Sequence, residues 1–376
     1  MKKYLFLTIL IAFVTAGKSY GIVDMPQSKT SEDKTVILDI SGEELNEDRS
    51  VQDAVIEENR LETGISKYYT FENGLLKLRV NDKLNLDFGL LGSMEWNNTP
   101  AQDNYNSNFK FNTVDIILSG QLKDNLDYKL QFLPHRNINE RTILGDVWTR
   151  YKYNNHSIYI GRMRKPVAYE PTFSPYDLEF ANYSQISRDF GDLRDSGFKT
   201  QSVYKYVDIA TGVYSNMQDR PFSFSRGGYE LDSWVLLKPI ANYPELGNLK
   251  IGGGFATGKK DYSYNIYSAA AIYDYKKLGL RAEYINKGAP EYNLKDTDGY
   301  HIDMVYSLTK KLQLALRFDS YNPDRHASTK DRSNEYVVGL NYYLNNRNTM
   351  FVLNYAFCDR KYDSHRISLQ ARYKTW

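Results

Sequence analysis

The feature that most constrains this chain is a period-two alternation of apolar and polar residues, which begins at Lys83 and continues to the C-terminus. A clear example is 312–319, where Leu, Leu, Leu and Phe alternate with Gln, Ala, Arg and Asp. Successive side chains of a β-strand point to opposite faces, so this pattern gives each strand one apolar face and one wet face. Strands buried on both faces would instead be continuously apolar.

About sixteen segments of this kind follow one another, each around ten residues long, which is the length that crosses a bilayer at the tilt of a barrel strand. The run 75–80 is also apolar at every second position, and it would either extend the first strand or form a small plug hairpin. We expect the strands near 83–96, 109–122, 126–134, 143–154, 156–165, 195–206, 207–215, 229–238, 247–257, 262–276, 278–287, 298–309, 312–322, 334–345, 348–359 and 364–376.

Short and long connections alternate along the chain, and short periplasmic turns with long external loops are typical of bacterial outer-membrane barrels. This register places both termini in the periplasm and makes 166–194 the third external loop. A soluble β-sandwich would also alternate, but it rarely has so many equal strands, and closure removes unpaired edges. We therefore predict an all-β chain that forms a closed antiparallel transmembrane β-barrel of about sixteen strands, with the third external loop folded inward.

The composition supports this reading. The chain has 33 Tyr against 17 Phe, and Tyr suits membrane interfaces, where one end of the ring is apolar and the other is wet. A mean hydropathy of −0.58 excludes a helical membrane bundle, whereas barrel strands need only be half apolar. The single cysteine, Cys358, excludes an intramolecular disulfide and a cysteine metal cluster.

The N-terminal part of the chain differs from the rest. Residues 1–21 carry Lys2 and Lys3 before an apolar run and then small residues, which predicts a secretory signal peptide and export. Residues 22–65 hold twelve Asp and Glu against four Lys and Arg and no aromatic residue. We interpret them as an acidic, mostly disordered periplasmic tail, or as a short helix that self-associates or touches peptidoglycan. The barrel domain would then span 66–376, with a net charge near +7.

The stretch 161–198 is a long, charged, proline-bearing interruption among short connections, and loops of that length are usually functional. Its cations are the candidates for the pore constriction and its ion selectivity. Lys165, Arg188 and Arg194 rank first. Arg162 and Arg164 rank behind them. They follow Ile158 and Ile160 at every second position of the strand, so their side chains would point outward like those of the two isoleucines, into external water or against lipopolysaccharide.

The alternation of side chains between the two faces of each strand also assigns charged residues to the wall of the lumen. The cations are Lys129, Arg150, Lys152, Arg281, Lys287, Arg317, Arg366 and Arg372, and the anions are Asp115, Asp127, Asp146, Glu283, Asp303 and Asp319. Arginine suits anions such as phosphate because its planar guanidinium presents a fork of donors and stays charged. The alternative is that these residues pair across neighbouring strands and hold the wall together, foremost Arg281 with Glu283 and Arg317 with Asp319.

The loop also carries a family resemblance. The run 159–166, Glu170, 176–180, Tyr183-Ser184 and 188–191 resembles the phosphate-selective porin O and P family. The resemblance implies a sixteen-stranded outer-membrane porin that forms homotrimers in lipid and lipopolysaccharide, with inward-folded loops and basic residues that conduct small anions, including phosphate or polyphosphate. It also implies recognition of C-terminal Trp376 by the outer-membrane assembly machinery, although the apolar set of the last strand is one residue out of phase with that Trp.

Enzyme signatures are weak. His301 and Asp303 share the lumen face, but no serine motif flanks them, and the sequence has no metal-ligand spacing or nucleic-acid signature. The glycines 252–254 lie inside a predicted strand with no following helix, so they indicate a bend or close packing rather than a phosphate loop. We therefore expect no enzyme and no cofactor, but an outer-membrane diffusion porin for small hydrophilic solutes with an anion preference. The alternative is a non-conducting barrel that acts as an adhesin or structural link.

Overall fold

A computed structural model describes most of the chain after residue 68. The described residues are 69–72, 75–81, 84–99, 104–134, 143–190, 193–215, 228–259, 263–288, 296–324, 332–344, 348–360 and 362–375. All of them belong to one compact unit, Asn59–Trp376. The predicted signal peptide 1–21, the acidic tail 22–65 and Trp376 lie outside the described residues. Among the described residues, no helix is both long enough and apolar enough to cross a membrane.

Strands make up nearly all of the described chain. The first two are short, β1 (Tyr69–Glu72) and β2 (Leu75–Asn81). The others are β3 (Leu84–Thr99), β4 (Asn104–Lys123), β5 (Leu126–Phe132), β6 (Leu144–Tyr153), β7 (His156–Arg164), β8 (Arg194–Val203), β9 (Val207–Tyr214), β10 (Tyr229–Leu237), β11 (Asn248–Lys259), β12 (Ser263–Tyr275), β13 (Leu278–Gly288), β14 (Thr297–Ser307), β15 (Leu312–Asn322), β16 (Ser333–Leu344), β17 (Thr349–Asp359) and β18 (Ser364–Lys374).

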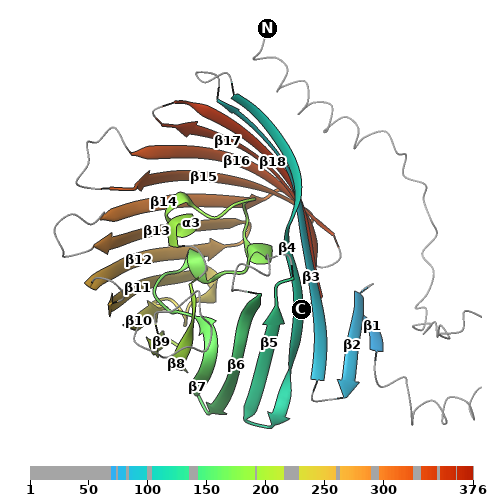
Figure 1. Cartoon of the computed structure of the whole chain (residues 1–376), viewed down its shortest axis with the longest axis vertical. Helices are drawn as coiled ribbons and strands as arrows, with labels where there is room; N and C mark the ends of the chain where they lie inside the picture. Colours follow the sequence, from blue (N-terminus) through green and yellow to red (C-terminus); the bar gives the residue numbers. More distant parts are fainter. Residues whose placement is uncertain are drawn as a thin grey trace, which may run out of the picture. The chain divides into compact units, whose positions relative to one another are not determined.

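The sixteen strands from β3 to β18 form a closed barrel (Figure 1). Each strand pairs antiparallel with its neighbour in sequence, as β3 does with β4 and β17 with β18. The ring closes where β18 pairs antiparallel with β3, from His365 opposite Asn98 to Lys374 opposite Gly89. The prediction of a closed antiparallel barrel of about sixteen strands is therefore confirmed. The expected ends hold within a few residues, except that β4 begins five residues earlier than predicted.

The run 75–80 forms a strand of its own rather than an extension of the first barrel strand. This strand, β2, pairs with β1 in a hairpin and with the beginning of β3, where Leu78 lies opposite Leu86. β18 pairs with β3 only as far as Gly89, and β2 pairs with the residues of β3 that precede it. At that junction Thr375 and Phe88 exchange backbone and side-chain hydrogen bonds, which ties the C-terminal end to the first barrel strand.

The two faces of the barrel wall have the reverse of a soluble protein's polarity. Large apolar side chains are exposed on the outer face: Leu90, Ile160, Ile302 and Leu369 are 43–60% exposed. Residues on the inner face are buried and polar, among them Asp303, Arg317 and Gln370. An apolar outer band around a polar interior is the arrangement that a lipid environment requires of a barrel.

Candidate functional site

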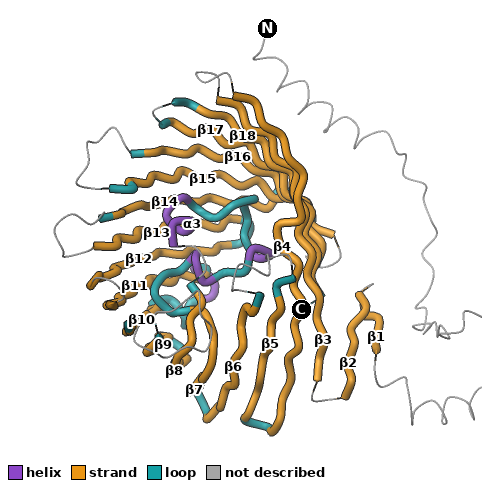
Figure 2. The backbone as a smooth tube through the Cα atoms, viewed as in Figure 1, coloured by secondary structure: helices purple, strands orange, loops and turns teal. Residues whose placement is uncertain are grey.

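The segment 165–193 connects β7 to β8, and its described residues, 165–190 and 193, lie against the inner face of the barrel wall (Figures 1 and 2). It contains two single 3₁₀ turns, η2 (Glu170–Thr172) and η3 (Pro175–Asp177), and the short helix α3 (Gln185–Phe190). Pro171 and Pro175 lie in the first positions of the two turns, where proline's fixed φ is compatible with helical geometry and its missing N–H costs nothing. We call this segment the inner loop.

The first anchor of the inner loop is an ionic network around Glu170. The backbone N–H groups of Tyr169 and Glu170 donate to the carboxylate of Glu283 on β13. The Glu170 carboxylate in turn accepts from Arg317 on β15 at 2.5 Å. Arg317 also donates to both oxygens of Asp303 on β14, each at 2.7 Å. One arginine therefore connects the loop to the wall.

The second anchor uses the backbone of the loop between residues 178 and 182. Arg372 on β18 donates to the carbonyls of Leu178 and Phe180. Amide side chains of neighbouring strands complete the contact: Asn341 donates to the Glu179 carbonyl, Gln370 donates to the Ala181 carbonyl, and Asn354 accepts from the Ala181 N–H. This irregular backbone is satisfied by the wall rather than by its own secondary structure.

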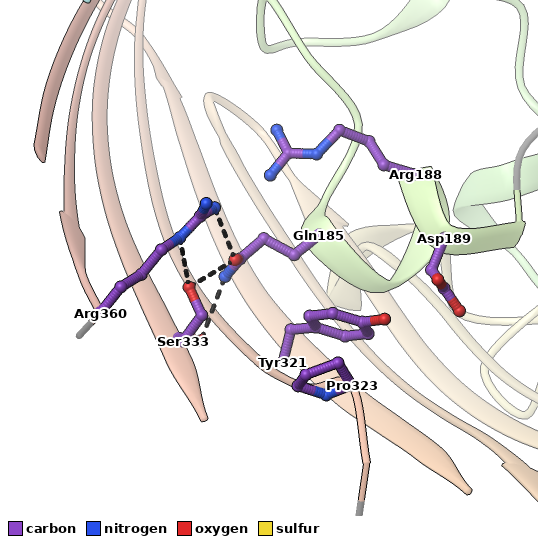
Figure 3. A pocket seen from close by; sticks show the side chains of 7 residues that line it. All are labelled: Gln185, Arg188, Asp189, Tyr321, Pro323, Ser333 and Arg360. Atoms are coloured by element: carbon purple, nitrogen blue, oxygen red, sulfur yellow. Dashed lines mark hydrogen bonds between the residues drawn. The ribbon is translucent and has the colours of Figure 1, made fainter. Parts of the chain in front are cut away.

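The third anchor holds α3. The backbone N–H of Gln185 donates to Asp319 on β15 at 2.6 Å, and its side chain exchanges hydrogen bonds with Ser333 on β16. Arg360 donates to Ser333 Oγ and to Gln185 Oε1 (Figure 3). Gln185, Ser333 and Arg360 border a cavity of about 400 Å³. Arg188 and Tyr321 also line it. The three anchors together fix the loop to β13–β18, on one side of the barrel interior.

A close approach at Gly254 on β11 adds a fourth contact. A Cβ at Gly254 would lie 2.2 Å from the carbonyl oxygen of Val167 in the inner loop, and the same carbonyl accepts a hydrogen bond from Ser268 on β12. Gly253, its neighbour, has only ordinary contacts. The prediction that 252–254 indicate close packing is confirmed here, because only a residue without a side chain lets the loop backbone approach β11.

We expect Gly254→Ala to displace the inner loop and to destabilise the protein by about 1–3 kcal/mol, the usual cost of overpacking. Gly253→Ala is the matched control, because its Cβ would meet nothing closer than 3.7 Å. Urea unfolding of both variants in detergent micelles measures the difference. Equal midpoints for Gly254→Ala and Gly253→Ala would show that this approach contributes nothing.

The structure separates the predicted loop cations into buried and accessible ones. Lys165 is 2% exposed and pairs with Glu230 on β10 at 2.5 Å. Arg194 is also buried, and its guanidinium donates to Asp146 and Gln131. Arg188 is the most exposed of the three, at 31% of its side chain, and pairs with Glu335 on β16 at 3.4 Å. Of the three first-ranked cations, Arg188 is therefore the best placed to meet a solute.

The expected exposure of Arg162 to external water is wrong. Arg162 is fully buried, and its Nε donates to the backbone carbonyl of Leu144, at the beginning of β6. Arg164 folds back onto its own loop and donates to the carbonyls of Pro171 and Phe173. Parity alone missed both arrangements because, at the end of the strand, the side chains turn toward backbone carbonyls of adjacent segments.

The wall cations predicted from parity lie on the inner face, but two of the expected pairs are wrong. Arg281 contacts Glu179 and Asp274 instead of Glu283, since Glu283 accepts from the loop backbone. Arg317 contacts Asp303 and Glu170 instead of Asp319, which accepts from Gln185. In both cases the inner loop supplies a partner that strand parity could not reveal.

The other wall cations also pair with carboxylates or carbonyls, except Lys287, whose ammonium lies over the ring of Tyr264, 5.5 Å from its centroid. Arg150 and Lys152 both contact Asp127, Lys129 contacts Asp146, and Arg366 contacts Glu335. The general expectation of cross-strand ion pairs is confirmed for Asp127 with Arg150 and for Asp303 with Arg317, which lie directly opposite each other in neighbouring strands.

In several of these pairs the cation is more exposed than its partner. Side-chain exposure is 26% for Lys129 against 11% for Asp146, and 40% for Lys152 against 12% for Asp127. Arg188 exposes 31% and Glu335 only 3%. The reverse holds for Asp274 with Arg281 and for Asp177 with Lys374. A solute beside β5, β6 and α3 therefore meets mainly the positive member of each pair.

A second cavity, of about 340 Å³, lies between the inner loop and the wall strands β4 and β5. Its charged lining consists of Arg164, Arg188, Arg194 and Asp115. Asp115 accepts a hydrogen bond from Gln131 and is only 2% exposed. Arg188 borders this cavity as well as the one in Figure 3, so it lies between the two.

Burial and neighbouring charges determine the ionisation of the loop groups. Burial acts to lower the pKa of Lys165, but Glu230 and Asp232 outweigh it, so the pKa is raised and the ammonium stays charged. Burial likewise acts to raise the pKa of Glu170, but Arg317 and His301 outweigh it and hold the pKa below its usual range. For Glu179 burial prevails over Arg281, and the pKa is raised.

Sequence reasoning missed the neutral anchors of the loop. The period-two alternation marks Asn341, Asn354 and Gln370 only as polar positions of their strands. Their signal was available in principle, because buried amide side chains on an inner face need hydrogen-bond partners.

A closed antiparallel barrel with an apolar outer face and a polar interior is the architecture of porins. Solved structures of the same fold include OprB from Pseudomonas putida (TM-score 0.64, 10% identity, 78% of this chain and 94% of that chain). They also include an anion-selective porin from Comamonas acidovorans (TM-score 0.59, 12% identity, 78% and 99%) and OmpF from Salmonella typhi in complex with daunomycin (TM-score 0.57, 14% identity, 79% and 100%). At these identities the likeness is one of fold.

A family model matches part of the sequence. Residues 247–371 match the family model of the phosphate-selective porins O and P, which confirms the resemblance drawn from the loop. The matched residues lie C-terminal to the run 159–191 that carries the resemblance in the sequence, so the two signals are separate. No curated protein matches the chain in sequence. Family and fold together indicate an outer-membrane porin, a channel rather than an enzyme.

Proposed function

We propose that this protein is a passive diffusion porin of the bacterial outer membrane that passes small hydrophilic solutes and prefers anions. The inner loop narrows the channel by occupying the side of the interior formed by β13–β18, which leaves the passage beside β4–β6. The loop cannot move freely, since hydrogen bonds join it directly to the five wall strands β13, β15, β16, β17 and β18.

The observation that carries the anion preference is the unequal exposure within the ion pairs beside this passage. Lys129, Lys152 and Arg188 expose their charge, whereas Asp146, Asp127 and Glu335 are shielded. Ion selectivity in wide pores depends on the charges that line the water-filled path, so the exposed members of the pairs determine the preference. Phosphate is a suitable solute for arginine, but the family description is the main support for it.

Several parts of the proposal rest on the fold and family rather than on contacts of this chain. Outer-membrane barrels insert into lipid and lipopolysaccharide, and we propose a homotrimer, by analogy with the trimeric form recorded for OmpT of Vibrio cholerae. The signal peptide 1–21 and recognition of Trp376 by the assembly machinery complete the proposed route to the outer membrane. Lys165, Arg194, Arg162 and Arg164 are proposed to shape the constriction, and Arg188 to face it.

Conductance in a planar bilayer tests the proposal. The refolded full-length protein is expected to give discrete conductance steps that scale with salt concentration, as a water-filled pore does. Heat-denatured protein at the same detergent concentration is the control. A correctly folded barrel, judged by β-structure in circular dichroism, that gives no steps at any voltage would contradict the porin function.

A further inference from the structure

The ionic network that anchors the inner loop contains a buried histidine which the pore proposal does not use. His301 on β14 is 2% exposed, and carboxylate oxygens face both of its ring nitrogens. Its Nε2 faces Glu283 Oε2 at 3.5 Å and Glu170 Oε2 at 3.7 Å, and its Nδ1 faces Asp303 Oδ1 at 3.2 Å. A buried imidazole on which three carboxylates converge requires an explanation.

The carboxylates around His301 outnumber the arginines that contact them among the described residues. Three carboxylates, those of Glu170, Glu283 and Asp303, converge on the ring, and Arg317 is the arginine that contacts them. Arg317 engages both oxygens of Asp303 and Oε1 of Glu170. Glu283 and Oε2 of Glu170 are left to the backbone N–H groups of residues 169, 170 and 184. Each carboxylate oxygen can accept a second partner.

From this arrangement we propose a divalent metal site of the zinc class at the junction of the inner loop and the wall, with His301 Nε2, Glu170 Oε2 and Glu283 Oε2 as ligands. Zinc bonds of about 2.0–2.1 Å place tetrahedral ligand atoms about 3.3–3.4 Å apart. The two observed nitrogen–oxygen separations, 3.5 and 3.7 Å, lie within a few tenths of an ångström of that spacing. One nitrogen and two carboxylates form a ligand set that zinc accepts.

The other side of the imidazole supports the same assignment. Metal-binding histidines usually donate their second ring N–H to a carboxylate, which orients the ring. Asp303 occupies this position opposite Nδ1, and the guanidinium of Arg317 donates a hydrogen bond to each of its two carboxylate oxygens. Asp303 is therefore a positioning residue rather than a ligand, although its carboxylate also lies within 4.8 Å of the Glu170 and His301 donor atoms.

The site would join three segments that are far apart in sequence: η2, β13 and β14. No ligand spacing is visible in the sequence because each segment contributes one ligand. Bound metal would fasten Glu170 of the inner loop to the wall and so stabilise the position of the constriction. The binding of metal does not depend on conductance, so the site and the porin function can fail separately.

Calorimetric titration of ZnCl₂ into the full-length protein, refolded without a histidine tag and treated with a chelator, tests the proposal. We expect one zinc per chain with sub-micromolar affinity at pH 7.5. His301→Gln keeps the size and polarity of the side chain and should weaken binding at least a hundred-fold, whereas Asp303→Asn should weaken it about ten- to a hundred-fold. His156→Gln is the control, because His156 is an exposed residue that bonds Ser202.

A second measurement needs no variant and decides the matter if His301→Gln does not fold. X-ray absorption of zinc bound to the wild-type protein should show one nitrogen ligand, oxygen ligands and no sulfur, which also separates this site from Cys358. Absence of stoichiometric binding, or equal binding by wild type and folded His301→Gln, would overturn the site. Zinc binding by a barrel that gives no conductance would support the site and contradict the porin function.

Discussion

Arg317→Met is expected to destabilise the barrel by about 3–5 kcal/mol and to loosen the inner loop. Arg317 is buried, and its removal leaves the carboxylates of Asp303 and Glu170 without their shared arginine inside the wall. Breaking a buried ion pair from one side is costly because the remaining charge is neither paired nor hydrated. The loss should appear as a lower urea midpoint in micelles and as noisy, larger conductance steps in a planar bilayer.

Arg366→Met is the matched control for this prediction. Arg366 is also a wall arginine with a carboxylate partner, Glu335, but that carboxylate keeps a second contact with Arg188. We expect Arg366→Met to cost less than about 1.5 kcal/mol, as for an ion pair whose partner remains compensated. Adding Asp303→Asn and Glu170→Gln to Arg317→Met should restore part of the stability, since both orphaned charges are removed. If Arg317→Met has the urea midpoint and the conductance noise of the wild type, Arg317 does not anchor the inner loop.

Replacing Lys129, Lys152 and Arg188 together with glutamine is expected to lower the anion-to-cation permeability ratio about five-fold. Each of these cations shares its carboxylate with a second one: Asp146 keeps Arg194, Asp127 keeps Arg150, and Glu335 keeps Arg366. The fold should therefore survive, while three exposed charges disappear from the passage. A charge a few ångströms from an ion in water contributes about 1 kcal/mol, which corresponds to about a five-fold change in permeability.

Glutamine at Lys205, Lys277 and Lys310 is the control with the same change in net charge. These lysines are exposed in short turns between strands rather than on the inner face. Reversal potentials in a KCl gradient compare the two triple variants with wild type, and low salt increases the contrast because screening is weaker. If both variants change the ratio equally, net charge rather than the lining of the passage determines the preference.

Much of the barrel was predictable because its determinants are local. Alternation of apolar and polar residues specifies strand length and facing, and turn residues mark the ends, so fifteen of the strands begin within a few residues of expectation. The early start of β4 was missed because 104–108 are polar residues without alternation. Such a segment extends only because β3 continues opposite it.

The contacts of the candidate site were predictable only in part. Strand parity placed Arg281, Arg317 and Arg372 on the inner face, but their partners are residues of the inner loop, more than a hundred positions away. Lys165 is one of the three cations that rank first for selectivity, but it is buried in an ion pair with Glu230 of β10. Contacts between a loop and the opposite wall depend on how the loop crosses the barrel, and a single sequence contains no local signal for that path.

The reversal potential of the wild-type protein in a planar bilayer tests the central claim most directly. With a ten-fold KCl gradient, we expect the sign of the reversal potential to show that chloride is more permeant than potassium. Replacing chloride with phosphate should retain the sign and a measurable current. A conducting pore whose reversal potential indicates preference for potassium would contradict the claim that the exposed cations beside β4–β6 determine the selectivity of this channel.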